Sequence, residues 1–183
     1  MLNRGGVILT LLLLALVSGS VWGQETYQRV TSVSELEAEK SFLIVNVDDQ
    51  GRCIALSNEQ KKNNRGAVAV ILANDKITLE QNSMACQLVL KGSSSVGWSF
   101  YDEVNGGYLY AASSSGNYLK TQSTLDDDGR ADIRFEANIA TITFKGTNKR
   151  NVMQYNPNNG SPLFACYGSE SQKPLQLFKK VES

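Results

Sequence analysis

The 183-residue sequence contains no histidine, so it lacks the commonest general base and any Ser–His or Cys–His nucleophilic pair. It also lacks a P-loop, a dinucleotide-binding fingerprint and a metalloprotease motif. Two carboxylates would suffice for glycosidic cleavage, but the acidic residues cluster in turn sequences, where solvent exposure explains them. The sequence therefore predicts a protein that is not an enzyme and has no cofactor.

The chain has no excess of charge of either sign, because 18 basic residues balance 18 acidic ones. It therefore lacks the excess of basic residues typical of a general nucleic-acid binder and the polybasic patch that attracts anionic membranes. No nucleic-acid partner is expected.

Cysteine is scarce: the three are Cys53, Cys86 and Cys166. An odd count leaves at least one thiol free or paired with another chain. Each lies in an apolar stretch, which favours three buried thiols; one disulfide and one free thiol is the alternative in an oxidising compartment. Without histidine or C-x-x-C spacing no metal site is predicted. The run 126–129 (DDDG) lacks EF-hand spacing and is interpreted as a polar turn.

Long apolar runs are missing except at residues 7–17, which are almost entirely Leu, Val, Ala and Ile. Arg4 precedes this run, and Val21-Trp22-Gly23 after it offers a small-x-small cleavage site, as in a signal peptide. The run is about half the roughly 20 residues that span a bilayer. The pattern predicts a signal peptide over residues 1–23, a single domain over 24–183, and a secreted or periplasmic protein without a membrane anchor.

One helical turn and many strands are expected in that domain. Residues 32–35 (SVSE) fit a capping box before one or two helical turns reaching Lys40. From Ser41 onward, short apolar or β-branched segments alternate with Gly, Asn, Asp and Ser clusters, which is typical of all-β proteins. The expected strands are residues 42–47, 53–57, 67–72, 76–80, 85–90, 98–102, 108–112, 117–122, 132–136, 140–145, 151–156, 163–167 and 175–181.

The strands repeat in three units, whose last strands contain Leu88, Ile133 and Leu177, 45 and 44 residues apart. Each unit has an entering strand, two further strands and a closing strand, and the first unit carries an insertion around residues 74–81. This organisation resembles the β-trefoil, the pseudo-threefold barrel of ricin-type lectins and Kunitz-type protease inhibitors. The expected fold is therefore all-β and trefoil-like, with a β-sandwich as the alternative.

Several segments also resemble an uncharacterised secreted β domain of Gram-negative bacteria. They are residues 63–67 (NNRGA), 107–113 (GYLYAAS), 150–156 (RNVMQYN), 163–167 (LFACY) and 175–178 (LQLF). In that group the domain is often appended to secreted nucleases and other hydrolases. The resemblance implies an accessory role and transfers no catalytic residue.

Aromatic residues crowd the second and third units, and carbohydrate sites combine an aromatic face with nearby Asn or Asp groups. Two candidate ligand-binding sets follow: Trp98, Tyr101, Asp102 and Asn105, and Tyr155, Asn156, Asn158 and Asn159. Ordinary strand packing is the alternative for each aromatic. The Gln-x-Trp ending of ricin-type lectins is matched only at its glutamine, at residues 87–89 (QLV) and 176–178 (QLF), and the tryptophan is missing. The sugar pocket of those lectins is therefore not carried over.

These patterns together predict a non-catalytic binding module for carbohydrate or another cell-surface ligand. One alternative is a protein-binding module, such as a protease inhibitor that uses the insertion at residues 75–83. Another is an accessory domain of a secreted nuclease or hydrolase. A trefoil-like fold alone does not decide between them.

Export gives the first testable prediction. When the full chain is expressed in a Gram-negative host, the protein outside the cytoplasm should begin at Gln24, because cleavage follows Gly23. Intact-mass measurement and N-terminal sequencing check this. A mature chain that still carries the apolar run 7–17 would contradict it.

Overall fold

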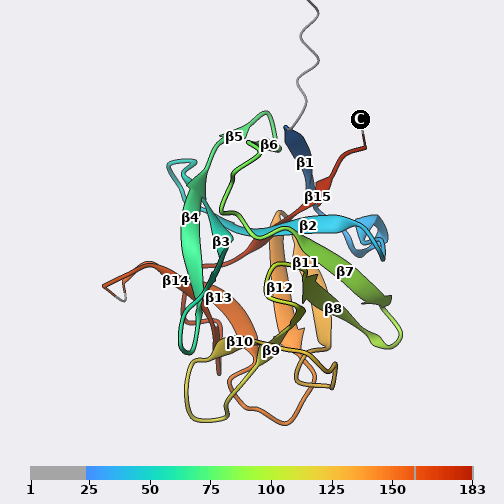
Figure 1. The fold of residues 1–183 in the computed structure, drawn as a ribbon, viewed down its shortest axis with the longest axis vertical. Coiled ribbons are helices and arrows are strands. Elements are labelled where there is room, and N and C mark those ends of the chain that lie inside the picture. Colours follow the sequence, from blue (N-terminus) through green and yellow to red (C-terminus); the bar gives the residue numbers. More distant parts are fainter. Residues whose placement is uncertain (1–23, 159, 183) are drawn as a thin grey trace, which may run out of the picture.

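The computed structural model describes residues 24–158 and 160–182, and this part of the chain is all-β (Figure 1). Fifteen antiparallel strands belong to one sheet. They are β1 (Glu25–Val30), β2 (Ser41–Val47), β3 (Cys53–Gln60), β4 (Arg65–Val70), β5 (Leu72–Ala73), β6 (Lys76–Leu79), β7 (Leu88–Ser93), β8 (Gly97–Asp102), β9 (Gly107–Ala111), β10 (Leu119–Gln122), β11 (Ala131–Glu136), β12 (Ile139–Phe144), β13 (Val152–Asn156), β14 (Leu163–Tyr167) and β15 (Gln176–Lys180). The expected signal peptide and Asn159 lie outside the described residues.

The helical segment expected to reach Lys40 is a single 3-10 turn, η1 (Val33–Glu35). The Glu35 carboxylate accepts hydrogen bonds from the backbone N–H groups of Thr31 (2.9 Å) and Ser32 (3.1 Å). These bonds, that of Thr31 foremost, lower the pKa of Glu35. Leu36 then adopts an extended backbone and is buried in the main core. No α-helix follows among the described residues because burial of Leu36 draws the chain away from the helical path.

The strands follow the three units expected from the sequence. Each unit has an entering strand, a hairpin and a closing strand: β2, β3–β4 and β7; β8, β9–β10 and β11; β12, β13–β14 and β15. The entering and closing strands pair in the closed order β2–β7–β8–β11–β12–β15–β2, in which β12 meets β15 through the bridge Ala140–Leu175. Leu88, Ile133 and Leu177 all belong to the main core of this ring.

A lobe of three additional strands covers the outer face of the first unit. The insertion forms the hairpin β5–β6, and β1 lies between β6 and β15 (Figure 1). Tyr27, Leu43, Ile77 and Phe178 are fully buried there in a second core. The sequence did not predict β1, because only Tyr27 and Val30 of its six residues are buried and they are three residues apart, not two.

One position in the ring departs from the symmetry of the three units. Leu177 pairs with Ile44, Ile133 pairs with Ile142, and Leu88 pairs with Asp102. A carboxylate thus takes a place that isoleucine fills in the other two units. Asp102 is fully buried, so it needs a partner of opposite charge.

That partner is Arg65, which is also fully buried and lies with Nη1 2.7 Å from Asp102 Oδ2. Arg65 Nη2 donates to Ser57 O (2.8 Å), and Nη1 donates to Thr121 Oγ1 (3.2 Å). Asp102 also accepts hydrogen bonds from the side chain and backbone of Asn105 (2.8 and 3.1 Å). The network joins β3 and β4 of the first unit to β8 and β10 of the second.

The pKa of Asp102 reflects this network. Burial alone would raise it, but the hydrogen bonds from Asn105 and the charge of Arg65 bring it below its ordinary value. A carboxylate with a lowered pKa stabilises the fold above the pKa of the unfolded chain. That contribution is lost only as the pH falls through the lowered, folded-state value.

Three free thiols are buried, as the apolar surroundings in the sequence favoured. Burial raises the pKa of Cys53 and Cys86 to about 12, against opposing effects of Arg29 and Arg65 respectively. Burial also raises the pKa of Cys166. Because the thiolate is the reactive form, we expect these buried thiols to react slowly in the folded protein.

The second prediction concerns the buried ion pair. Asp102→Asn should lower the free energy of unfolding by about 3–5 kcal/mol, since it leaves the Arg65 charge buried without a counter-charge. The control is Asp132→Asn, whose partner Lys145 lies 3.7 Å away at the surface; it should cost no more than about 1 kcal/mol. Urea unfolding measures both, and equal losses would contradict the assignment.

The third prediction concerns the thiols. Iodoacetamide at pH 8 should leave the folded protein unmodified, because the thiols are buried and protonated, and should add three groups once urea unfolds the chain. Intact-mass measurement counts the adducts. Rapid labelling of one thiol in the folded protein would show that it is reactive.

Candidate functional site

Two members of the first predicted ligand-binding set, Trp98 and Asp102, lie in the interior of the protein, whereas Asn105 is exposed. Trp98 is 7% exposed and Asp102 0%, because alternate residues of β8 point into the core. Asn105 bonds to Asp102 and to Asn58 O (3.0 Å). Only Tyr101 keeps a half-exposed ring, in edge contact with Tyr108 at 5.0 Å. Trp98 and Asp102 are therefore unsuited to stack on or bond a sugar.

The second predicted set divides between two faces of β13. Asn156 donates from Nδ2 to Tyr167 Oη (2.9 Å) and accepts from the backbone N–H of Asn158 (2.9 Å). Tyr155 points the other way, because consecutive strand residues face opposite sides. It packs on Phe164, with ring centroids 5.2 Å apart, and lines a surface groove. Among the described residues of the two sets, Tyr155 is the one that lines this groove.

This hollow, which we call the Tyr155 groove, has a volume of about 560 Å³ and lies between the first and third units. That volume falls within the range of about 300–1,000 Å³ typical of ligand sites. The first unit contributes the end of β2, the following turn and the start of β3, and the third unit contributes β13 and the segment before β15. The lining residues are Asn46, Val47, Asp48, Asp49, Gln50, Arg52, Ile54, Tyr155, Pro157, Lys173 and Pro174.

One wall of the groove is the turn between β2 and β3, which Asp48 organises. Asp48 Oδ1 accepts from the backbone N–H groups of Gln50 (3.0 Å) and Arg52 (2.9 Å), and Oδ2 accepts from Arg52 Nε (2.6 Å). Gly51 supplies the positive φ of 77° that the turn needs. Burial alone would raise the pKa of Asp48, but the hydrogen bonds from Arg52 and Gln50 lower it, so the carboxylate is ionised.

The opposite wall is held by backbone hydrogen bonds and proline. Tyr155 N donates to Lys173 O (3.1 Å), and Lys173 N donates to Tyr155 O (3.0 Å). Two of the three prolines in the sequence, Pro157 and Pro174, line this wall. The buried Asn46 joins the walls by donating from Nδ2 to Pro174 O (2.8 Å). Fixed proline φ angles make a preformed site, which reduces the entropy lost on binding.

The Tyr155 hydroxyl is a hydrogen-bond donor in this setting. Burial raises its pKa, and the Arg52 charge only partly opposes the effect. A tyrosine hydroxyl is protonated at neutral pH, so Tyr155 can donate a hydrogen bond to a ligand in the groove that it lines, beside charges of both signs.

The Tyr155 groove lies at one of three related boundaries between units, which we call seams. At each seam the turn after the entering strand of one unit faces the hairpin of the unit before it in the ring, and the third unit precedes the first. Three equivalent backbone bonds mark the seams: Asn58 N to Met84 O, Ala111 N to Asp128 O, and Tyr155 N to Lys173 O. At the first two, an asparagine from the facing turn donates to the marked residue: Asn105 to Asn58 O (3.0 Å) and Asn148 to Ala111 O (2.8 Å). At the third, Tyr155 O instead accepts from the backbone of Lys173, and the groove lies beside it.

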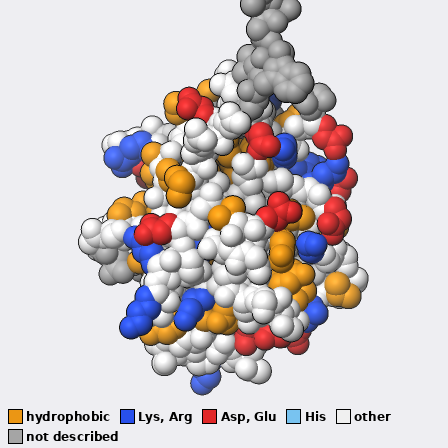
Figure 2. Space-filling model, viewed as in Figure 1, with side chains coloured by type: hydrophobic (Ala, Val, Ile, Leu, Met, Phe, Trp, Pro, Cys, Tyr) orange, Lys and Arg blue, Asp and Glu red, His pale blue; other side chains and the backbone are white. Residues whose placement is uncertain are grey.

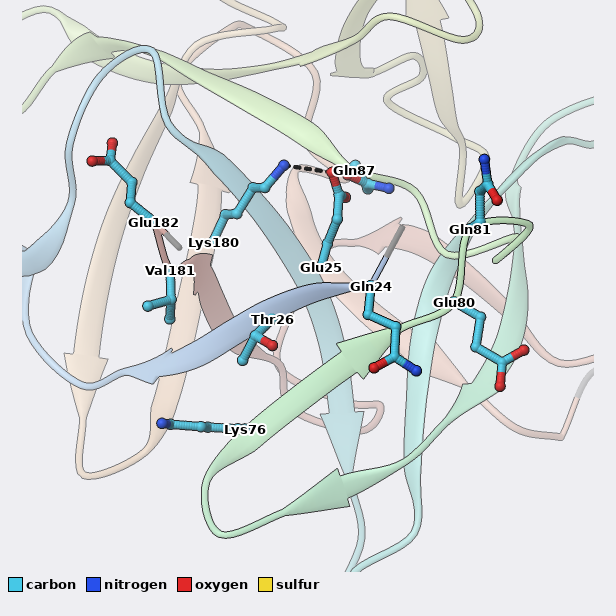
Figure 3. Close-up of a pocket in the computed structure, with 10 residues that line it drawn as sticks. All are labelled: Gln24, Glu25, Thr26, Lys76, Glu80, Gln81, Gln87, Lys180, Val181 and Glu182. Atoms are coloured by element: carbon cyan, nitrogen blue, oxygen red, sulfur yellow. Dashed lines mark hydrogen bonds and ion pairs between the residues drawn. The ribbon is translucent and has the colours of Figure 1, made fainter. Parts of the chain in front are cut away.

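A larger hollow of about 630 Å³ lies at the other end of the first unit (Figure 3). It is formed by β1, β6 and the end of β15, and its wall includes the ion pair between Glu25 and Lys180 (2.5 Å). No aromatic side chain lines it. One ion pair, Glu25–Lys180, lies within the wall, and the hollow lacks the aromatic side chain that the Tyr155 groove has.

The surface charge, the metal ligands, the helices and the insertion in the first unit were compared with the expectations from the sequence. Basic, acidic and apolar side chains are interspersed on the face that Figure 2 shows. Within residues 24–158 and 160–182, no three His, Cys, Asp or Glu side chains are grouped to hold a metal ion. No helix in the same ranges is long and apolar enough to cross a membrane. The insertion proposed as an inhibitor loop is the β5–β6 hairpin, whose Asp75 is tied to Arg29 at 2.7 Å.

No family model and no curated protein sequence matches the chain. Its fold is similar to that of lysenin. The crystal structure of the lysenin pore has a TM-score of 0.50 and 12% identity, with 84% of this chain and 50% of that chain covered. The complex of lysenin with phosphocholine has a TM-score of 0.51 and 12% identity, with 85% and 48% covered. The chain thus spans about half the length of these structures, and the likeness concerns the fold alone.

Sequence reasoning missed most of the Tyr155 groove. It identified Tyr155, but not that Tyr155 meets the turn between β2 and β3, since more than a hundred residues separate the two. A usable signal was the pair Pro157 and Pro174, because proline is otherwise almost absent from the chain.

Proposed function

We propose that this protein is an exported, non-catalytic binding module of β-trefoil architecture, and that the Tyr155 groove is its ligand site. The closed order of six entering and closing strands, with one hairpin per unit, supports the trefoil assignment. The apolar N-terminal segment supports export. An accessory role beside a separate secreted hydrolase fits the same assignment.

One observation carries the choice of site. At two of the three seams an asparagine of the facing turn bonds the hairpin carbonyl, whereas at the third the asparagine bond runs from Asn46 of β2 to Pro174 O and a groove of about 560 Å³ lies beside it. The facing turn of the third seam bonds itself and leaves space that a ligand can occupy. The aromatic, cationic and amide groups around it are those that bind polar ligands.

The ligand class is a carbohydrate or another polar group of a cell surface. Tyr155 is 6% exposed, so its phenolic O–H and not its ring face would meet a ligand, and the exposed Gln50, Arg52 and Lys173 supply further donors for the hydroxyl groups of a sugar. Lysenin has been solved in complex with phosphocholine, whose quaternary ammonium group would be attracted by the exposed Asp49 carboxylate. Both classes therefore belong in the test.

The fourth prediction tests the site with residues 24–183. We expect retention on a glycan array or on immobilised phosphocholine, and about 2- to 10-fold weaker binding by Tyr155→Phe, which removes one hydrogen bond of about 0.5–1.5 kcal/mol. Phenylalanine keeps the packing on Phe164, whereas Tyr155→Ala would also open a cavity in the fold.

The matched control is Tyr101→Phe, which removes a hydroxyl from a half-exposed tyrosine of β8, outside the groove. The Tyr101→Phe protein should bind as the unmodified protein does. Neither Tyr101→Phe nor Tyr155→Phe should change the melting temperature. Equal binding by the Tyr155→Phe protein would reject this site, and a folded protein that retains none of these ligands would reject the proposed function.

A further inference from the structure

The donors that surround the Tyr155 groove are largely free. Arg52 uses Nε for Asp48, but its side chain is 72% exposed and its two terminal nitrogens remain available. Lys173 is exposed, and its ammonium group forms no ion pair within the described part of the chain. The Tyr155 hydroxyl is protonated. Two cationic groups and one neutral donor therefore border one cavity.

Of the two carboxylates that line the groove, one is already occupied. Asp48 already accepts two backbone N–H groups and Arg52 Nε, so little of its capacity is left for a ligand. Asp49 is the other carboxylate among the lining residues and is exposed at the tip of the turn. A ligand that enters the groove thus meets spare donors of positive charge and one spare carboxylate at the rim.

We infer that the ligand of the Tyr155 groove is an acidic glycan, whose carboxylate, phosphate or sulfate oxygens bind between Arg52 and Lys173. This inference rests on the proposed function, because it names the ligand class for the same groove. Guanidinium and ammonium groups form their strongest hydrogen bonds with oxyanions. A neutral sugar would leave Lys173 without a charged partner and would offer no oxyanion to the terminal nitrogens of Arg52, whose Nε already pairs with Asp48.

The closing experiment uses an array on which each acidic glycan has a neutral partner with the same sugar backbone. Carboxylated glycans are printed before and after methyl esterification, and phosphorylated and sulfated glycans beside their parent sugars. The protein should bind the acidic glycans at least tenfold more strongly than their neutral partners. The series that it binds most strongly identifies whether the groove prefers a carboxylate, a phosphate or a sulfate. Binding should weaken as salt is raised from 50 to about 500 mM.

Two charge-removing variants assign the effect to the groove. Lys173→Gln should weaken binding of acidic glycans about tenfold, while Lys76→Gln, which makes the same charge change on β6 in the other hollow, should leave it unchanged (Figure 3). Both lysines are exposed, so neither variant should alter the melting temperature. Asp49→Asn should strengthen binding of an acidic glycan, because it removes a repulsive charge.

The outcomes separate this inference from the proposed function. Equal binding of neutral and acidic partners that still depends on Tyr155 would overturn the inference and keep the site. Weaker binding by Asp49→Asn, with phosphocholine as the preferred ligand, would also overturn it, because Asp49 would then serve a ligand ammonium group. A folded protein that binds no glycan and no phosphocholine would reject both.

Discussion

The ion pair between Arg65 and Asp102 is the interaction on which the arrangement of the units depends. Two fully buried charges are favourable only when each is matched in charge and hydrogen bonding. Here Ser57 of β3, Asp102 of β8 and Thr121 of β10 meet at Arg65, and Asn105 in the next turn bonds Asp102. A shift of the first unit against the second would separate these groups and leave a charge buried without its partner.

The same requirement explains why the seams between the units differ. Asn105 satisfies Asp102 and closes the first seam, and Asn148 closes the second through Ala111 O. The third seam has Asp48, whose hydrogen bonds remain within its own turn. A turn that satisfies itself does not need to bond its neighbour, so a groove can persist beside Tyr155 without leaving buried polar groups unpaired.

The sequence predicted more of the fold than of the site. The four-strand order, the insertion in the first unit and the buried thiols were readable because turns and apolar segments alternate locally. The first candidate site failed at Trp98 and Asp102 because the same alternation points both into the core. Strand β1 was missed because its burial comes from the β5–β6 hairpin and β15, which are distant along the chain. The groove around Tyr155 joins segments from opposite ends of the domain.

The sequence by itself determined the all-β class, the three-unit order and the absence of histidine-based chemistry, since these depend on composition and on contacts between near neighbours. Tertiary structure alone decided which polar residues became interior partners and which face a ligand. Asp102 and Asp48 both precede turns and look alike in the sequence. Their roles differ because Arg65 reaches one across the core, while the other binds its own turn and lies beside a tyrosine brought there by closure of the ring.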